Sequence, residues 1–118
     1  MRFYYLNNPQ EVSLSFEDVL PEGAKEVLPN SVEAAYEKHI PEVKVNGNEV
    51  DVAVGSVEHP MLDVHYISWI LLVNGKEILI KKLQPGEKPV AKFLLQNKEK
   101  EIAVYAFCNL HGLWIAKA

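Results

Sequence analysis

The chain has four histidines and one cysteine, and these side chains are well suited to hold a metal ion. The histidines are His39, His59, His65 and His111, and the cysteine is Cys108. Cys108 and His111 are three residues apart, a spacing at which a thiolate and an imidazole commonly bind one ion. All five stand beside turn-forming residues or at the ends of predicted strands, where β scaffolds usually present functional groups. The pattern therefore predicts one metal site.

Five candidate ligands favour iron over zinc or copper. Structural zinc is closed by four ligands. Blue copper is a closer alternative, because it combines a β-sandwich with a late cysteine and histidine, but it usually adds an axial methionine after that histidine. Gly112, Leu113 and Trp114 follow His111, and two histidines would be left over. Iron accepts five protein ligands and keeps a sixth position open, so we expect iron, with a copper or zinc site as the alternative.

From about residue 42 onward the chain reads as short strands separated by turns. Alternating apolar residues and turn signals predict seven strands, at 43–45, 50–54, 66–73, 77–83, 90–95, 100–107 and 113–116. Asn46-Gly47 and Asn74-Gly75 are typical tight turns of hairpins. Residues 66–73 are almost continuously apolar, as in a strand covered on both faces. We therefore expect an all-β fold, an immunoglobulin-like antiparallel sandwich.

The first part of the chain lacks this regular pattern. We expect residues 1–30 to form an irregular N-terminal arm without a metal site, with one or two short strands at most. Residues 31–118 then form the iron-binding sandwich domain. Asn30 or Ser31 is a suitable cap for one helical turn through residues 32–36.

Composition and charge exclude several classes of protein. With 118 residues, 48% of them hydrophobic, the chain fits one packed domain. A net charge of −4 without a basic stripe argues against nucleic-acid binding. No apolar run approaches the roughly 20 residues that span a bilayer, and the start is too short for a secretory signal. A single cysteine forms no intrachain disulfide, so we expect a reducing cytoplasm.

Three blocks of sequence together resemble the superoxide reductases, the neelaredoxin and desulfoferrodoxin family. They are Glu37-Lys38-His39-Ile40-Pro41, His59-Pro60-Met61 with His65-Tyr66-Ile67, and Cys108-Asn109-Leu110-His111-Gly112-Leu113-Trp114. The resemblance covers about residues 27–117. It implies an immunoglobulin-like sandwich with an accessible iron that reduces superoxide to hydrogen peroxide. Desulfoferrodoxins add an N-terminal domain whose four cysteines hold a second iron. Residues 1–30 contain no cysteine, so the chain resembles the type without that centre.

The resemblance also implies individual roles. The four histidines match equatorial ligands of one iron ion (Fe2+/Fe3+) per chain, and Cys108 matches the axial ligand. Glu37 matches a carboxylate that can close the sixth position in the ferric state, and Lys38 a cation beside the open position. We accordingly expect superoxide as the substrate, a rubredoxin-like electron donor and a homo-oligomer, either dimer or tetramer.

Overall fold

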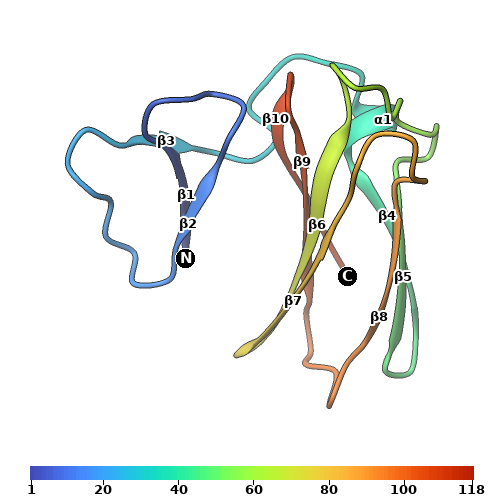
Figure 1. Ribbon diagram of the computed structural model, residues 1–118. Helices are drawn as coiled ribbons and strands as arrows, with labels where there is room; N and C mark the ends of the chain where they lie inside the picture. The colour runs from blue at the N-terminus through green and yellow to red at the C-terminus, as the bar shows by residue number, and fades with distance from the viewer.

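Seven strands in the second part of the chain form two antiparallel sheets that face each other (Figure 1). This computed structural model describes residues 1–118. One sheet has the order β10-β9-β6-β7 and the other β4-β5-β8, which agrees with an immunoglobulin-like topology. The strands are β4 (Pro41–Asn46), β5 (Glu49–Val54), β6 (Ile67–Asn74), β7 (Glu77–Lys82), β8 (Val90–Leu94), β9 (Ala103–Cys108) and β10 (Gly112–Lys117). The predicted sandwich is confirmed; the largest shift is at β9, which begins at Ala103 rather than at residue 100.

The core between the two sheets follows from the alternation of apolar residues along the strands. In β5, Val50, Val52 and Val54 are at most 3% exposed, whereas Glu49 and Asp51 point to solvent. Burial of one such apolar side chain contributes about 1.5–3 kcal/mol. The two predicted tight turns, at Gly47 and Gly75, are present. Their φ angles of 62° and 59° are positive, which favours glycine at both positions.

The first 30 residues differ from the prediction. Three short strands, β1 (Arg2–Tyr5), β2 (Ser13–Ser15) and β3 (Lys25–Val27), form a sheet of order β2-β1-β3. The chain therefore has ten strands rather than seven, and the expectation of an irregular arm with at most two strands was wrong. The pattern misled because these strands are only three or four residues long. The division of the chain into domains at residue 30 stays a prediction.

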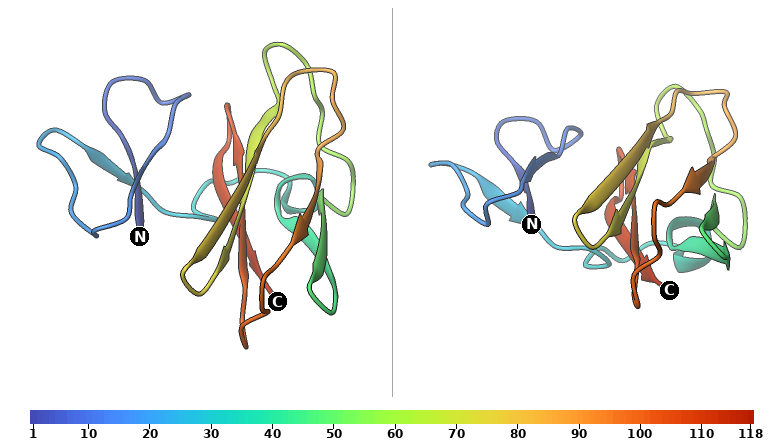
Figure 2. Two further views of the ribbon diagram at one scale, coloured as in Figure 1. Left: turned by 60° about the horizontal axis from the view of Figure 1, so that its bottom comes forward. Right: turned by 90° about the horizontal axis from the view of Figure 1, so that it is seen from below.

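The small N-terminal sheet lies beside the β10-β9-β6-β7 sheet, on the side away from the sandwich core (Figures 1 and 2). Phe3 of β1 is 4% exposed and forms a buried cluster with Phe107 and Leu113. The ring of Trp69 stacks on Phe3 at a centroid distance of 6.0 Å. Strand β6 is thus covered on both faces, as its apolar sequence indicates.

The only helix is also displaced from its predicted position. α1 (Tyr36–His39) begins after Ala35, and neither Asn30 nor Ser31 caps it. Asn30 instead bonds to β10, where its Oδ1 accepts from Ile115 N at 2.9 Å. The Ser31 hydroxyl donates to Leu28 O at 2.7 Å. Both capping groups are therefore used elsewhere.

No helix of this structure is long and apolar enough to cross a bilayer.

Contacts with the loop that follows β5 hold α1 in place. Val57 N donates to Glu37 O at 2.9 Å, and the Ser56 hydroxyl donates to the same oxygen at 3.3 Å. Gly55 lies so close to α1 that a Cβ there would be 2.7 Å from both Glu37 O and Ile40 O. Only glycine allows this approach, because both neighbours are backbone atoms.

We predict that Gly55→Ala displaces α1 and lowers the free energy of unfolding by about 1–3 kcal/mol, the usual cost of forcing an extra carbon into a packed site. Denaturant unfolding measures the loss. Gly47→Asn is the matched control, because a Cβ at Gly47 meets no atom within 4 Å and asparagine tolerates its positive φ. If Gly55→Ala were as stable as the wild type, the proposed close packing of this loop against α1 would be wrong.

Candidate metal centre

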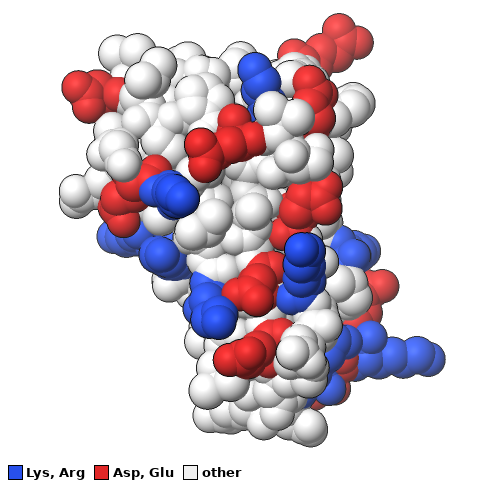
Figure 3. All heavy atoms as spheres, turned by 90° about the vertical axis from the view of Figure 1, so that its right-hand side faces the viewer, with Lys and Arg blue, Asp and Glu red and all other residues white.

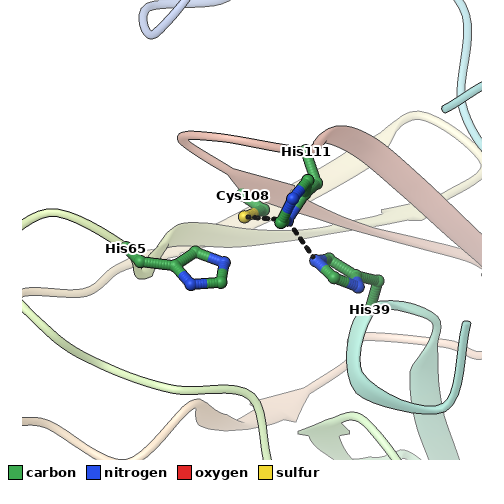
Figure 4. Close-up of side chains that lie close together, drawn as sticks. All are labelled: His39, His65, Cys108 and His111. Atoms are coloured by element: carbon green, nitrogen blue, oxygen red, sulfur yellow. Dashed lines mark hydrogen bonds between the residues drawn. The ribbon is translucent and has the colours of Figure 1, made fainter. Parts of the chain in front are cut away.

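The predicted ligands meet near α1, which lies at one end of the sandwich (Figure 1). His39 is the last residue of α1, and His59 and His65 lie in the connection between β5 and β6. Cys108 ends β9, and His111 immediately precedes β10. Figure 4 shows His39, His65, Cys108 and His111 gathered around a common centre, and one ligand atom from each lies within 4.8 Å of the others. Three segments distant in sequence thus contribute to one site: α1, the β5–β6 connection and the turn between β9 and β10.

His59 is not in that group of four, but it completes a ring of imidazoles. Its ring centroid lies 4.7 Å from that of His39 and 4.7 Å from that of His65. The remaining two neighbouring distances are 5.1 Å between His65 and His111 and 4.9 Å between His111 and His39. Neighbouring rings stand at 76–88° to each other. All four histidines therefore surround one point.

Two backbone carbonyls fix the protonation of the buried histidines. His39 Nδ1 lies 2.7 Å from Ala35 O, and His59 Nδ1 lies 2.6 Å from Pro60 O. A carbonyl oxygen can only accept, so each Nδ1 carries the proton and each Nε2 presents a lone pair. Such a bond at the far nitrogen is the usual way in which a protein orients a metal-binding imidazole.

The lone pairs then point at each other. His39 Nε2 lies 3.2 Å from His59 Nε2 and 3.1 Å from His111 Nδ1. In the neutral rings, His39 and His59 cannot form a hydrogen bond across this gap, because neither Nε2 has a proton to donate. His65 Nε2 is also buried without a partner. A cation at the centre would satisfy all of these nitrogens, so the residues present fit a metal ion.

Burial keeps these histidines in the neutral form that binds metals. It lowers the pKa of His59 to about 4, although the bond to Pro60 opposes the shift. Burial also lowers the pKa of His39 and of His65. Neutral imidazoles at physiological pH therefore need no deprotonation before they bind an ion.

The cysteine lies next to this ring. Cys108 is 0% exposed, and its sulfur lies 3.8 Å from His111 Nδ1. Burial raises the pKa of the thiol, while the backbone N–H groups of Leu110 and His111 act in the opposite direction. A metal ion would displace the thiol proton, as thiolate ligands require. The site thus offers four imidazoles and one sulfur to a single ion.

One side of the site is open to solvent. His39 and His59 are 2% and 1% exposed, whereas His65 and His111 are partly exposed. A hollow of about 420 Å³ borders His59, and Lys38, Glu58, Glu87 and Lys88 are among its lining residues. A small molecule can therefore approach the site at the exposed edges of His65 and His111, while the hollow reaches only the buried His59.

Glu37 and Lys38 are exposed residues of α1, next to His39. Lys38 lines the hollow, and its ammonium group adds to the effects of burial and of His111 that lower the pKa of His65. The Glu37 carboxylate acts weakly in the other direction on the pKa of His39. Both charges thus act on the site, but the structure gives neither side chain a direct contact with a predicted ligand.

The surface around this end is not uniformly positive. Figure 3 shows the side with β4, β5 and β8, where acidic and basic groups are interspersed and acidic groups predominate toward the end that carries α1. Attraction of an anion would therefore depend on a local positive charge rather than on the net charge of −4.

Trp114 supports the site, a role that was not predicted for it. Its side chain is 0% exposed, and Nε1 donates to His111 O at 3.1 Å. Its ring lies 4.9 Å from the His39 ring. A buried tryptophan three residues after a candidate ligand was the available signal, since its N–H needs a nearby acceptor.

The desulfoferrodoxin family model matches residues 31–117, from before α1 to the end of β10. The desulfoferrodoxin of Clostridium acetobutylicum is 49% identical over 90 residues, which are 76% of this chain and 70% of the relative. The superoxide reductase of Thermococcus kodakarensis is 34% identical over 95 residues, covering 66% of this chain and 83% of the relative.

Solved structures show the same likeness. The superoxide reductase of Treponema pallidum matches with a TM-score of 0.75 and 38% identity, over 98% of this chain and 97% of that one. A superoxide reductase (1Fe-SOR) of Giardia intestinalis matches with a TM-score of 0.64 and 39% identity, over 70% of this chain and 97% of that one. On the match over residues 31–117 and on these relatives, the chain belongs to the desulfoferrodoxin family.

Proposed function

We propose that this protein is a superoxide reductase. The reaction adds one electron and two protons to superoxide and yields one hydrogen peroxide. The observation that carries the proposal is the ring of four imidazoles, with facing lone pairs, next to the buried Cys108 thiol. We propose His39, His59, His65, His111 and Cys108 as ligands of one iron per chain, and Glu37 and Lys38 as catalytic residues. Iron in this site would supply the electron and an open coordination position.

The chain's own residues would prepare the site for a small anion. Fe2+ with one thiolate and four neutral imidazoles has a net charge of about +1, which gives a local positive centre on an acidic protein. Lys38, at the edge of the hollow, adds a second positive charge and can order water that delivers protons. Glu37 would close the open position in the oxidised state. This division of roles rests on their places beside His39 and on the exposure of both side chains.

The blue-copper alternative loses support at Met61. Its sulfur accepts a hydrogen bond from Ile67 N at 3.4 Å, and the side chain packs against the sandwich core. The Met61 sulfur is therefore already occupied by this bond, and Met1 packs against the cluster of Phe3, Phe107 and Leu113. No methionine is placed as an axial ligand.

We also propose the remaining features of the reaction's setting. The single cysteine leaves no second cysteine-bound redox centre, so electrons must come from another molecule, for which a rubredoxin-like carrier is suitable. A homo-oligomer, either dimer or tetramer, and a cytoplasmic location remain proposals of the same kind. The location rests on a thiol that must stay reduced to bind the metal.

Rapid mixing of the reduced, iron-loaded protein with superoxide tests the function directly. We expect one hydrogen peroxide for each superoxide consumed, one oxidised iron per chain and no release of dioxygen. Dismutation would instead release one dioxygen for every two superoxide ions. Dioxygen release at that ratio, or an absence of reaction, would overturn the proposal.

We predict that Lys38→Ala slows the second-order encounter with superoxide by about 5- to 30-fold, equivalent to roughly 1–2 kcal/mol of barrier. The loss is limited because the iron itself remains positive. The rate should also depend less on ionic strength, since salt screens charges over about 10 Å at 0.1 M. Stopped-flow kinetics measure both effects. Lys76→Ala is the matched control, because Lys76 is an exposed lysine in the β6–β7 turn. Equal losses in both variants would contradict a local role for Lys38.

We predict that Glu37→Ala leaves the encounter rate almost unchanged, because a carboxylate does not assist an arriving anion. The oxidised protein should change its visible spectrum and bind azide more readily, since the sixth position stays open. Spectral titration with azide measures this, and Glu58→Ala, which removes an exposed carboxylate next to His59, controls for charge. If Glu37→Ala slowed the encounter more than Lys38→Ala, the two roles would be assigned wrongly.

A further inference from the structure

His65 is held differently from the two buried histidines of the site. A carbonyl oxygen fixes the rings of His39 and His59 at Nδ1. The structure gives the His65 ring no hydrogen bond, and its Nε2 is buried without a partner. The orientation of this ring must therefore depend on the backbone that carries it.

That backbone belongs to a short turn beyond the end of the sheet. Leu62 and His65 pair through both of their backbone hydrogen bonds, at 2.9 and 3.1 Å. The pairing of β6 with β9 ends at Ile67 and Cys108. Regular strand pairing therefore does not join the turn with His65 to the segment with Cys108 and His111, although both must supply ligands to one ion.

Asn109 joins these two segments. Its side-chain Oδ1 accepts from Tyr66 N at 2.9 Å, and its Nδ2 donates to Val64 O at 3.1 Å. Its backbone N donates to Tyr66 O at 3.2 Å. Both immediate neighbours of His65 are thus bound by one residue, which follows the cysteine ligand directly. The amide side chain of Asn109 thus bonds to the backbone of Tyr66 and Val64, where the pairing of β6 with β9 has already ended.

We propose that Asn109 is the positioning residue that sets His65 against Cys108 and His111. The proposal rests on the proposed iron site. Asn109 contacts no ligand atom, so its action passes through the backbone of Val64 and Tyr66. The asparagine amide suits this task because it donates and accepts at once, as a backbone peptide does. Ligand groups must be held within about 0.5 Å of their working geometry, and this clamp supplies that constraint for a ring with no hydrogen bond of its own.

Asn109→Ala removes both side-chain bonds and leaves the backbone bond. We expect the affinity of the full chain for Fe2+ to fall by about 10–100-fold, as is usual when a residue that orients a ligand is lost. Competition with a chelator measures the affinity, and hydrogen exchange at Tyr66 N, which should become faster, reports on the metal-free protein. Asn48→Ala is the matched control, because Asn48 Oδ1 accepts from Lys98 N at 3.1 Å near the far end of the sandwich. It should lose stability but not iron affinity.

A double-mutant cycle separates positioning from general destabilisation. If Asn109 acts through His65, adding Asn109→Ala to His65→Ala should cause no further loss of affinity, because the ligand it positions is already absent. Thermal unfolding of each variant verifies that the compared proteins are folded.

Two results would overturn the proposal. In one, the two losses of iron affinity multiply in the double variant; in the other, Asn109→Ala binds iron as tightly as the wild type. Either result would leave the iron site itself intact. Failure of the wild-type chain to bind iron would instead overturn the proposed function. The two failures are therefore distinguishable.

Discussion

Two buried imidazoles that are neighbours in the site turn their unprotonated nitrogens toward each other, and each already donates its one N–H proton to a backbone carbonyl. His39 and His59 bring their Nε2 atoms to 3.2 Å, although neither can donate to the other. Burial also makes protonation unfavourable, which lowers the pKa of His59 to about 4. A metal ion removes this conflict, because it binds both lone pairs at once. The arrangement thus favours a bound cation over an empty pair of neutral rings.

The sandwich serves to impose this arrangement. Cys108 is positioned by the end of β9. His39 is positioned by α1, and the loop at Gly55 packs closely against the backbone of this helix. Trp114, buried in β10, supports His39 and His111 together. His59 and His65 lie in the connection between β5 and β6, which is not part of a sheet. There local hydrogen bonds replace strand pairing, and Asn109 is the clearest case.

The sequence allowed the sandwich and the ligand types to be predicted, because both leave a local pattern. The alternation of Val50, Val52 and Val54 has the period of a strand, and a lone cysteine near four histidines stands out by residue type alone. The strands of the N-terminal sheet are too short for such a pattern, and their packing depends on contacts distant in sequence, such as Phe3 against Phe107. Asn30 was predicted as a helix cap. Its actual bond is to β10, 85 residues away, and such a distant contact leaves no pattern in the neighbouring sequence. The tautomers and the Asn109 clamp likewise depend on contacts distant in sequence.

X-ray absorption at the iron edge of the reduced, iron-loaded protein tests the proposed ligand set. We expect one iron per chain with one sulfur and four imidazole nitrogens as neighbours, and loss of the sulfur in Cys108→Ser. A bound metal with no sulfur neighbour in the wild type, or an unchanged spectrum in Cys108→Ser, would contradict it. So would a chain that binds zinc with four ligands and takes up no iron.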